Sequence, residues 1–158
     1  MGEAIDSSKG GTSTGEAIAL GGRRVASVMR RDFVTIDALG QLQNAISIMR
    51  LARLRHLPVE RDGALAGLLS YRLIQDAMID LLKHGRDPVT GLSDVSIDSM
   101  MTEAPFTISP SSTLREAAGR LCALKLGCLP VVETIDGREQ LVGLITETDL
   151  LLAAYAGP

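Results

Sequence analysis

The chain has 158 residues, of which 46% are apolar, and it carries a formal charge of −3. This is enough apolar material to bury a core as one domain or as two small tandem units, and no apolar run approaches the roughly 20 residues that span a bilayer. A slightly acidic chain with 3% aromatic residues lacks the basic field and stacking side chains of nucleic-acid-binding surfaces. Its acidic start and short first apolar stretch are not those of a secretory signal.

The first 22 residues read as a flexible tail. The stretch 7–15 is polar and rich in glycine, so ordering it would cost more entropy than it could recover. Gly10 and Gly15 have the glycine spacing of a phosphate loop, but Glu16 stands where that loop needs lysine. Part of the tail, residues 16–20, could dock as a short helix.

A first repeat is expected over residues 23–85. Apolar periodicity, β-branched residues and turn signals predict a strand, a helix, two strands joined by a turn, and a second helix. In chain order these elements cover residues 34–36, 41–54, 57–59, 65–69 and 71–83, with the turn at 61–63. Gly85 and Pro88 end the last helix, and residues 86–96 form a connector.

The second repeat, residues 97–158, reproduces this order. Its elements are expected at residues 107–108, 114–125, 129–133, 140–145 and 147–155. Its hairpin loop is expected to be four residues longer than the first. The predicted fold class is therefore α/β (α+β), with two pseudo-twofold-related units and their sheets meeting at a central cleft.

The clearest sign of duplication is a strand-to-helix junction that occurs twice. Residues 143–149 read Gly-Leu-Ile-Thr-Glu-Thr-Asp, and residues 67–73 read Gly-Leu-Leu-Ser-Tyr-Arg-Leu. Each follows a Leu-Pro-Val, at residues 57–59 and 129–131. A recurring unit is strong information about fold. Only the second copy keeps an acid, Asp149, at its last position.

These motifs resemble a tandem pair of cystathionine-β-synthase (CBS) domains, often called a Bateman module. The resemblance covers about residues 25–155, and Met29 and Met101 fit the segments that lead into each repeat in that family. It implies a non-catalytic sensor that binds an adenosine nucleotide (AMP, ADP or ATP) in the cleft between the repeats and signals to an effector protein. S-adenosylmethionine and cyclic nucleotides are alternative ligands.

The resemblance implies that Asp149 binds the ribose hydroxyls and that Thr146 lies near the phosphate, with Leu144 and Thr148 beside them. The chemistry is consistent, because a carboxylate accepts strong hydrogen bonds from vicinal hydroxyls and a helix start favours a phosphate oxygen. The same Thr-x-x-Asp is also an ordinary capping box, which stays open as the alternative.

The other wall of the Asp149 site is expected from the first repeat, by the pseudo-twofold arrangement of the family. Met29, Asp32 and Val34 would lie beside the base. Arg55 and His56, with Arg53 in reach, would face the phosphates as a cationic cluster. The alternatives are a histidine satisfied at a strand start and arginines that complement a helix C-terminus.

A weaker second site is expected where Leu73 replaces the acid, since leucine cannot bind a ribose. Ser70 should cap its helix there. The positions that match the first site contain no cation, so this site should be weak or empty. They are Ala104, Phe106, Gly127 and Cys128.

Enzymatic activity finds little support, because the sequence shows no catalytic constellation, no metal-ligand spacing and no requirement for a cofactor. Cys122 and Cys128 have neither the spacing of a metal knuckle nor of a redox motif, so we expect both to be buried thiols in a reducing cytoplasm. The competing function is a structural dimerisation module with a vestigial site.

A homodimer is expected because the helices at 71–83 and 147–155 carry more apolar residues than one packed face requires. A second copy would cover the surplus by using one patch twice. The alternative cover is the tail at residues 16–20.

Overall fold

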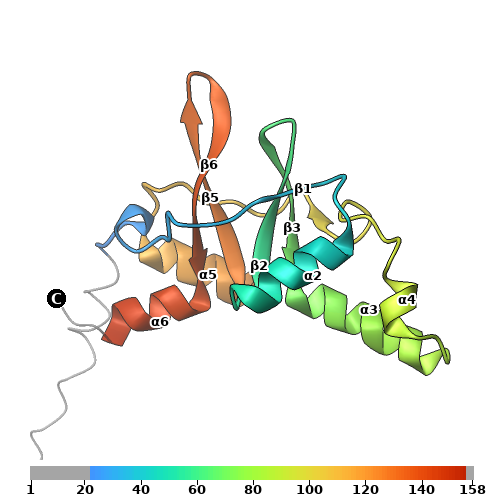
Figure 1. Cartoon of the computed structure of the whole chain (residues 1–158). Helices are drawn as coiled ribbons and strands as arrows, with labels where there is room; N and C mark the ends of the chain where they lie inside the picture. The colour runs from blue at the N-terminus through green and yellow to red at the C-terminus, as the bar shows by residue number, and fades with distance from the viewer. Residues whose placement is uncertain (1–21, 156–158) are drawn as a thin grey trace, which may run out of the picture.

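The computed structural model describes residues 22–155, so the expected tail and its short helix lie outside the described residues, except for Gly22. Two similar halves stand side by side, each with a hairpin on one side and helices on the other (Figure 1). In chain order the elements are η1 (Val25–Ser27), β1 (Ile36–Asp37), α2 (Leu42–Leu51), β2 (His56–Arg61), β3 (Ala64–Ser70), α3 (Tyr71–Lys83), α4 (Pro88–Gly91), β4 (Thr102–Glu103), α5 (Leu114–Leu124), β5 (Cys128–Ile135), β6 (Arg138–Thr146) and α6 (Glu147–Tyr155). The duplicated α/β architecture is as predicted.

Both hairpins close with the same two-residue turn. Asp62 and Gly63 have φ values of 53° and 77°, and Asp136 and Gly137 have 51° and 75°. Positive φ at both central positions gives the tight turn that matches strand twist, which is why Asp-Gly stands in each. The expectation of a longer second loop is wrong. The four extra residues pair with one another and lengthen β5 and β6 instead, so this hairpin projects further (Figure 1).

The strands form two separate sheets, β1-β2-β3-β4 and β5-β6. The first strand of each repeat is shorter than predicted. In the first repeat only Ile36 and Asp37 pair, in parallel with Val59 and Glu60. In the second, the strand is reduced to a single bridge between Ile108 and Val131. Residues 31–35 instead run across both hairpins toward β1 without a strand partner (Figure 1).

Each half has its own core, and the two cores exchange their leading segments. We call residues 25–30 the first leading segment and residues 97–103 the second. The core of the first half contains Ala38, Leu42, Ala45, Met49, Leu57, Val59, Leu69, Ile74, Leu92, Ile97 and Met101. The core of the second half contains Val25, Met29, Ile108, Leu114, Ala117, Leu121, Leu129, Val131, Ile145 and Ala153. Met101 thus packs in the first half, and Val25 and Met29 pack in the second.

Backbone pairing fixes this exchange. In the second leading segment, β4 pairs antiparallel with β3 through Gly67 and Leu68. In the first, the Arg30 N–H donates to the Leu144 carbonyl at 2.8 Å, and the Leu144 N–H donates to the Arg30 carbonyl at 3.0 Å. Glycine is required at both crossings, since Met101 lies against Gly67 and Met29 against Gly143. The first leading segment is thereby held against the strand that ends at Thr146.

No helix within residues 22–155 combines the length and apolar character needed to cross a membrane.

Candidate functional site

The carboxylate of Asp149 lies at the first turn of α6 and is held by its own helix start. The Thr146 N–H and hydroxyl donate to Asp149 Oδ2 at 2.9 and 2.6 Å, and the Asp149 N–H donates to Thr146 Oγ1 at 3.3 Å. This is a capping box, the alternative that the sequence left open. Asp149 is only 6% exposed. Thr146 and Asp149 therefore lie together, as expected, and they stabilise the start of α6.

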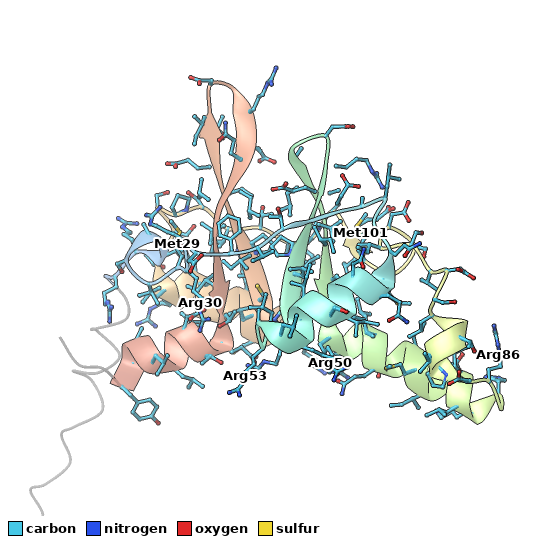
Figure 2. All side chains as sticks on the ribbon, in the orientation of Figure 1. Met29, Arg30, Arg50, Arg53, Arg86 and Met101 are labelled. Atoms are coloured by element: carbon cyan, nitrogen blue, oxygen red, sulfur yellow. The ribbon has the colours of Figure 1, made fainter. Side chains whose placement is uncertain are left out.

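The second carboxylate oxygen is occupied by a residue that the sequence reasoning missed. Arg30 Nε donates to Asp149 Oδ1 at 2.8 Å, and the arginine side chain is 54% exposed. Arg30 directly follows Met29, which had been placed beside this site, and Figure 2 shows both residues on the first leading segment, beside the second half. Its position next to Met29 could have indicated the contact, since the resemblance already placed Met29 opposite Asp149.

The other residues expected around Asp149 differ in how far they are buried. Met29 is buried against Gly143, and Leu144 is buried in β6, where it pairs with Arg30. Asp32 and Val34 are both exposed, Val34 by 47%, on the chain that crosses to β1. Within residues 22–155, no hydrogen bond or ion pair joins Asp32 to Asp149.

Arg55 connects the first half to the start of α6. Its Nη2 donates to Thr148 Oγ1 at 3.3 Å. Arg53, two residues earlier, has a left-handed backbone with φ of 53° and is exposed beyond the end of α2 (Figure 2). Two guanidinium groups therefore lie at the junction of the repeats, and one of them contacts the helix that carries Asp149.

A cavity of about 670 Å³ lies on the side of the expected weaker site. It brings together Ser70, Phe106, Gly127 and Cys128, whereas Ala104 is exposed and does not line it. Ser70 caps α3 as predicted, because its Oγ accepts from the Leu73 N–H at 3.3 Å.

The matched positions of this weaker site contain no cation, but basic residues from other positions line the cavity. The basic side chains that line the cavity are Arg55, Arg72 and Lys125. Arg55 and His56 lie close to the junction of the two repeats and so line this cavity as well. Matching positions between the repeats could not show this, because it depends on how the two halves pack together.

His56 does not belong to a cationic cluster. Burial, followed by the nearby Arg55 guanidinium, lowers the pKa of His56 below its ordinary 6.5, so the imidazole is neutral at pH 7. Its ring lies over Gly127, where an added Cβ would come within 2.8 Å of Cε1. The positive charge expected at this wall therefore comes from the arginines.

Acidification is expected to destabilise the protein through His56. Because the folded state holds the pKa of His56 below 6.5, the unfolded state binds more protons, and the free energy of unfolding falls as pH drops below about 6.5 toward the lowered value. Thermal unfolding at about pH 7.5 and about pH 5.5 should show a smaller loss for His56→Gln than for the wild type. His84→Gln is the matched control, since His84 is exposed. Equal acid sensitivity of the wild type and His56→Gln would contradict the assignment.

The two cysteines differ from the expectation that both are buried. Both are free thiols, but Cys122 is exposed on α5, whereas Cys128 is buried. Burial, with the Asp149 charge as a smaller cause, raises the pKa of Cys128 to about 12, so it stays a neutral thiol. Within residues 22–155, no three histidine, cysteine, aspartate or glutamate side chains are grouped to hold a metal ion.

Comparison with known proteins agrees with this architecture. The sequence matches the CBS domain over residues 25–80 and 93–156, and the chain belongs to this family. It is 30% identical over 131 residues to a CBS domain-containing protein of Dictyostelium discoideum, covering 80% of this chain and 88% of that one. It is 28% identical over 126 residues to the CBS domain-containing protein YhcV of Bacillus subtilis, covering 80% and 81%.

Among solved structures, the fold is similar to that of CBSX2 in complex with AMP. The TM-score is 0.70 at 25% identity, over 85% of this chain and 98% of that chain. CBSX2 from Arabidopsis thaliana gives a TM-score of 0.71 at 24% identity, over 85% and 96%. The two repeats with exchanged leading segments are thus a CBS pair.

Proposed function

We propose that this chain is a non-catalytic regulatory module that binds an adenosine nucleotide between its repeats and passes the change to an effector protein. The observation that carries the proposal is the start of α6. There the Thr146 hydroxyl donates to the Asp149 carboxylate. Arg55, from the other repeat, donates to the Thr148 hydroxyl in the same helix turn. A CBS pair of similar fold is known in complex with AMP.

Each part of a nucleotide finds a chemically suited group in this arrangement. The carboxylate of Asp149 can accept from both ribose hydroxyls. The first turn of α6, with Arg55 beside it, favours phosphate oxygens through its free N–H groups and positive charge. The exposed Val34 offers an apolar surface for the base next to the first leading segment.

Calorimetry against a nucleotide panel tests the proposal. AMP, ADP or ATP should bind more tightly than adenosine, because Arg53 and Arg55 attract the phosphates, and the preference should shrink with added salt, since exposed charges are screened over about 8–10 Å. Arg55→Gln should reduce the preference, and the exposed Arg86→Gln, at the far end of α3 (Figure 2), should leave it unchanged. S-adenosylmethionine and a cyclic nucleotide complete the panel. Adenosine binding as tightly as AMP at low salt would refute the role of the arginines.

The second candidate function is a structural dimerisation module with a vestigial ligand site. It is favoured by the fact that both oxygens of Asp149 already have protein partners. Failure of every nucleotide to bind, together with a stable dimer, would select this function over the first.

A homodimer built on α3 and α6 is expected under either function. Large apolar side chains on these two helices are exposed, and exposed apolar patches on monomers are generally small. They are Ile79, Leu82, Leu151, Leu152 and Tyr155. Light scattering on a chain shortened to begin at Gly22 should still give a dimer. A well-behaved monomer at micromolar concentration would rule the dimer out.

A further inference from the structure

The ion pair between Arg30 and Asp149 occupies the place that a ribose would need. One carboxylate oxygen accepts two hydrogen bonds from Thr146, and the other accepts the Arg30 Nε at 2.8 Å. Asp149 is only 6% exposed with this guanidinium bound to it, whereas the Arg30 side chain is 54% exposed. Vicinal hydroxyls can reach this carboxylate only where the arginine gives way.

The equivalent site of the other repeat, at Leu73, shows what stands in place of the contact between Arg30 and Asp149. Arg30 follows Met29 as Thr102 follows Met101, and Leu73 stands where the other junction has Asp149. Without an arginine and an acid at these positions, Thr102 lines an open cavity of about 670 Å³. The guanidinium of Arg30 thus lies at the position equivalent to an open binding space.

The arginine is anchored by its backbone but not by its side chain. Arg30 exchanges two backbone hydrogen bonds with Leu144, at 2.8 and 3.0 Å. These bonds hold the backbone of Arg30 beside β6. Its side chain is 54% exposed, and within residues 22–155 its one hydrogen-bonded partner is Asp149. The guanidinium can therefore turn into solvent while the first leading segment stays in place.

We propose that Arg30 is an internal competitor for the ligand, which holds the Asp149 carboxylate in the empty protein and is displaced when a nucleoside binds. The proposal rests on the proposed function, since it names the regulation of the same site. Ligand binding then releases a positive charge on the first leading segment, which packs in the second half. Arg30 sets the affinity and marks the bound state by its own release.

The test compares adenosine with AMP in calorimetry of the full chain. Arg30→Gln removes the competing charge and should tighten adenosine binding by roughly threefold to tenfold, the effect of losing a half-exposed ion pair. Arg30→Lys can still reach the carboxylate and should show a smaller gain. Arg31→Gln removes the same charge from the exposed neighbouring position and should change nothing. In the wild type, the Arg30 Nε–H signal in NMR should be protected from water exchange, and saturation with adenosine should abolish the protection.

The sign of the effect separates competition from support. A structural role, or a direct contact of Arg30 with the phosphate, would make Arg30→Gln bind AMP more weakly, and that result overturns the proposal. Wild-type binding with no gain in Arg30→Gln overturns the proposal alone and leaves the nucleotide function standing. If neither protein binds adenosine or AMP, the proposed function fails and takes the proposal with it. Adenosine binding by Arg30→Gln but not by the wild type would be its strongest support.

Discussion

Asp149→Ala is expected to weaken AMP binding by about tenfold to a hundredfold. The change removes the charged acceptor for two ribose hydroxyls, and losing such charge-assisted hydrogen bonds costs roughly 1.5–3 kcal/mol. Asp149 supplies the single carboxylate of this capping box, so alanine leaves the box without a charged acceptor. Calorimetric titration at low salt measures the loss directly.

Two controls separate this effect from damage to the fold. Leu73→Ala alters the equivalent position of the other junction and should leave affinity within about a factor of three. Ser70→Ala removes the cap of α3, as Asp149→Ala disturbs the cap of α6, and should cost about 1 kcal/mol of stability. Equal losses of affinity at Asp149 and Leu73 would contradict a single strong site.

Gly143→Ala and Gly67→Ala are each expected to destabilise the protein by about 1–3 kcal/mol, the usual effect of overpacking a core. At Gly143 an added Cβ would lie 2.9 Å from both the Arg30 carbonyl oxygen and Met29 Sδ. At Gly67 it would overlap Met101 Sδ and lie 3.0 Å from the Thr102 carbonyl oxygen. Backbone atoms cannot move aside as a side chain can, so the leading segments must shift. Thermal unfolding should show a decrease of about 2–4 °C for each kcal/mol lost.

Gly119→Ala provides a control of opposite sign. Gly119 is exposed in the middle of α5, and nothing lies within 4 Å of an added Cβ. Alanine there should stabilise the protein by about 0.5–1 kcal/mol, because it restricts the unfolded chain and suits a helix. A loss of stability in Gly119→Ala equal to that in Gly143→Ala would show that close packing at the leading segment is not the cause.

The fold was predictable because its signals are local and occur twice. Helical periodicity placed α3 over Tyr71–Lys83 as observed, and Asp62-Gly63 marked the first hairpin turn, whereas the equal turn at Asp136-Gly137 was missed. The exchange of leading segments was not predictable from the same signals. The pairing of β4 with β3 and of Arg30 with Leu144 joins residues from different repeats, and strand patterns within one repeat carry no information about it.

The site was predictable in its chemistry but not in its present state. Thr146-x-x-Asp149 identified the polar junction, and the structure shows that these groups are engaged by the protein itself. The neutral state of His56 also escaped prediction, since it depends on burial and on the nearby Arg55, neither of which a sequence displays. The sequence shows which side chains can carry a charge. Whether a side chain is protonated, and which residue it pairs with, depends on its burial and neighbours in the folded structure.

The exchanged leading segments also suggest how a tandem pair can begin. The leading segment of each repeat packs on the hairpin of the other half. A single repeat alone would therefore leave the surface around its hairpin glycine, Gly67 or Gly143, uncovered. Two identical copies would cover each other reciprocally, because a twofold contact uses one surface twice. Joining the copies in one chain keeps both contacts and removes their dependence on concentration. From then on each half can change alone, as Arg30 with Asp149 and Thr102 with Leu73 now differ. The tandem chain is thus equivalent to a symmetric dimer whose two halves are joined and free to differ in sequence.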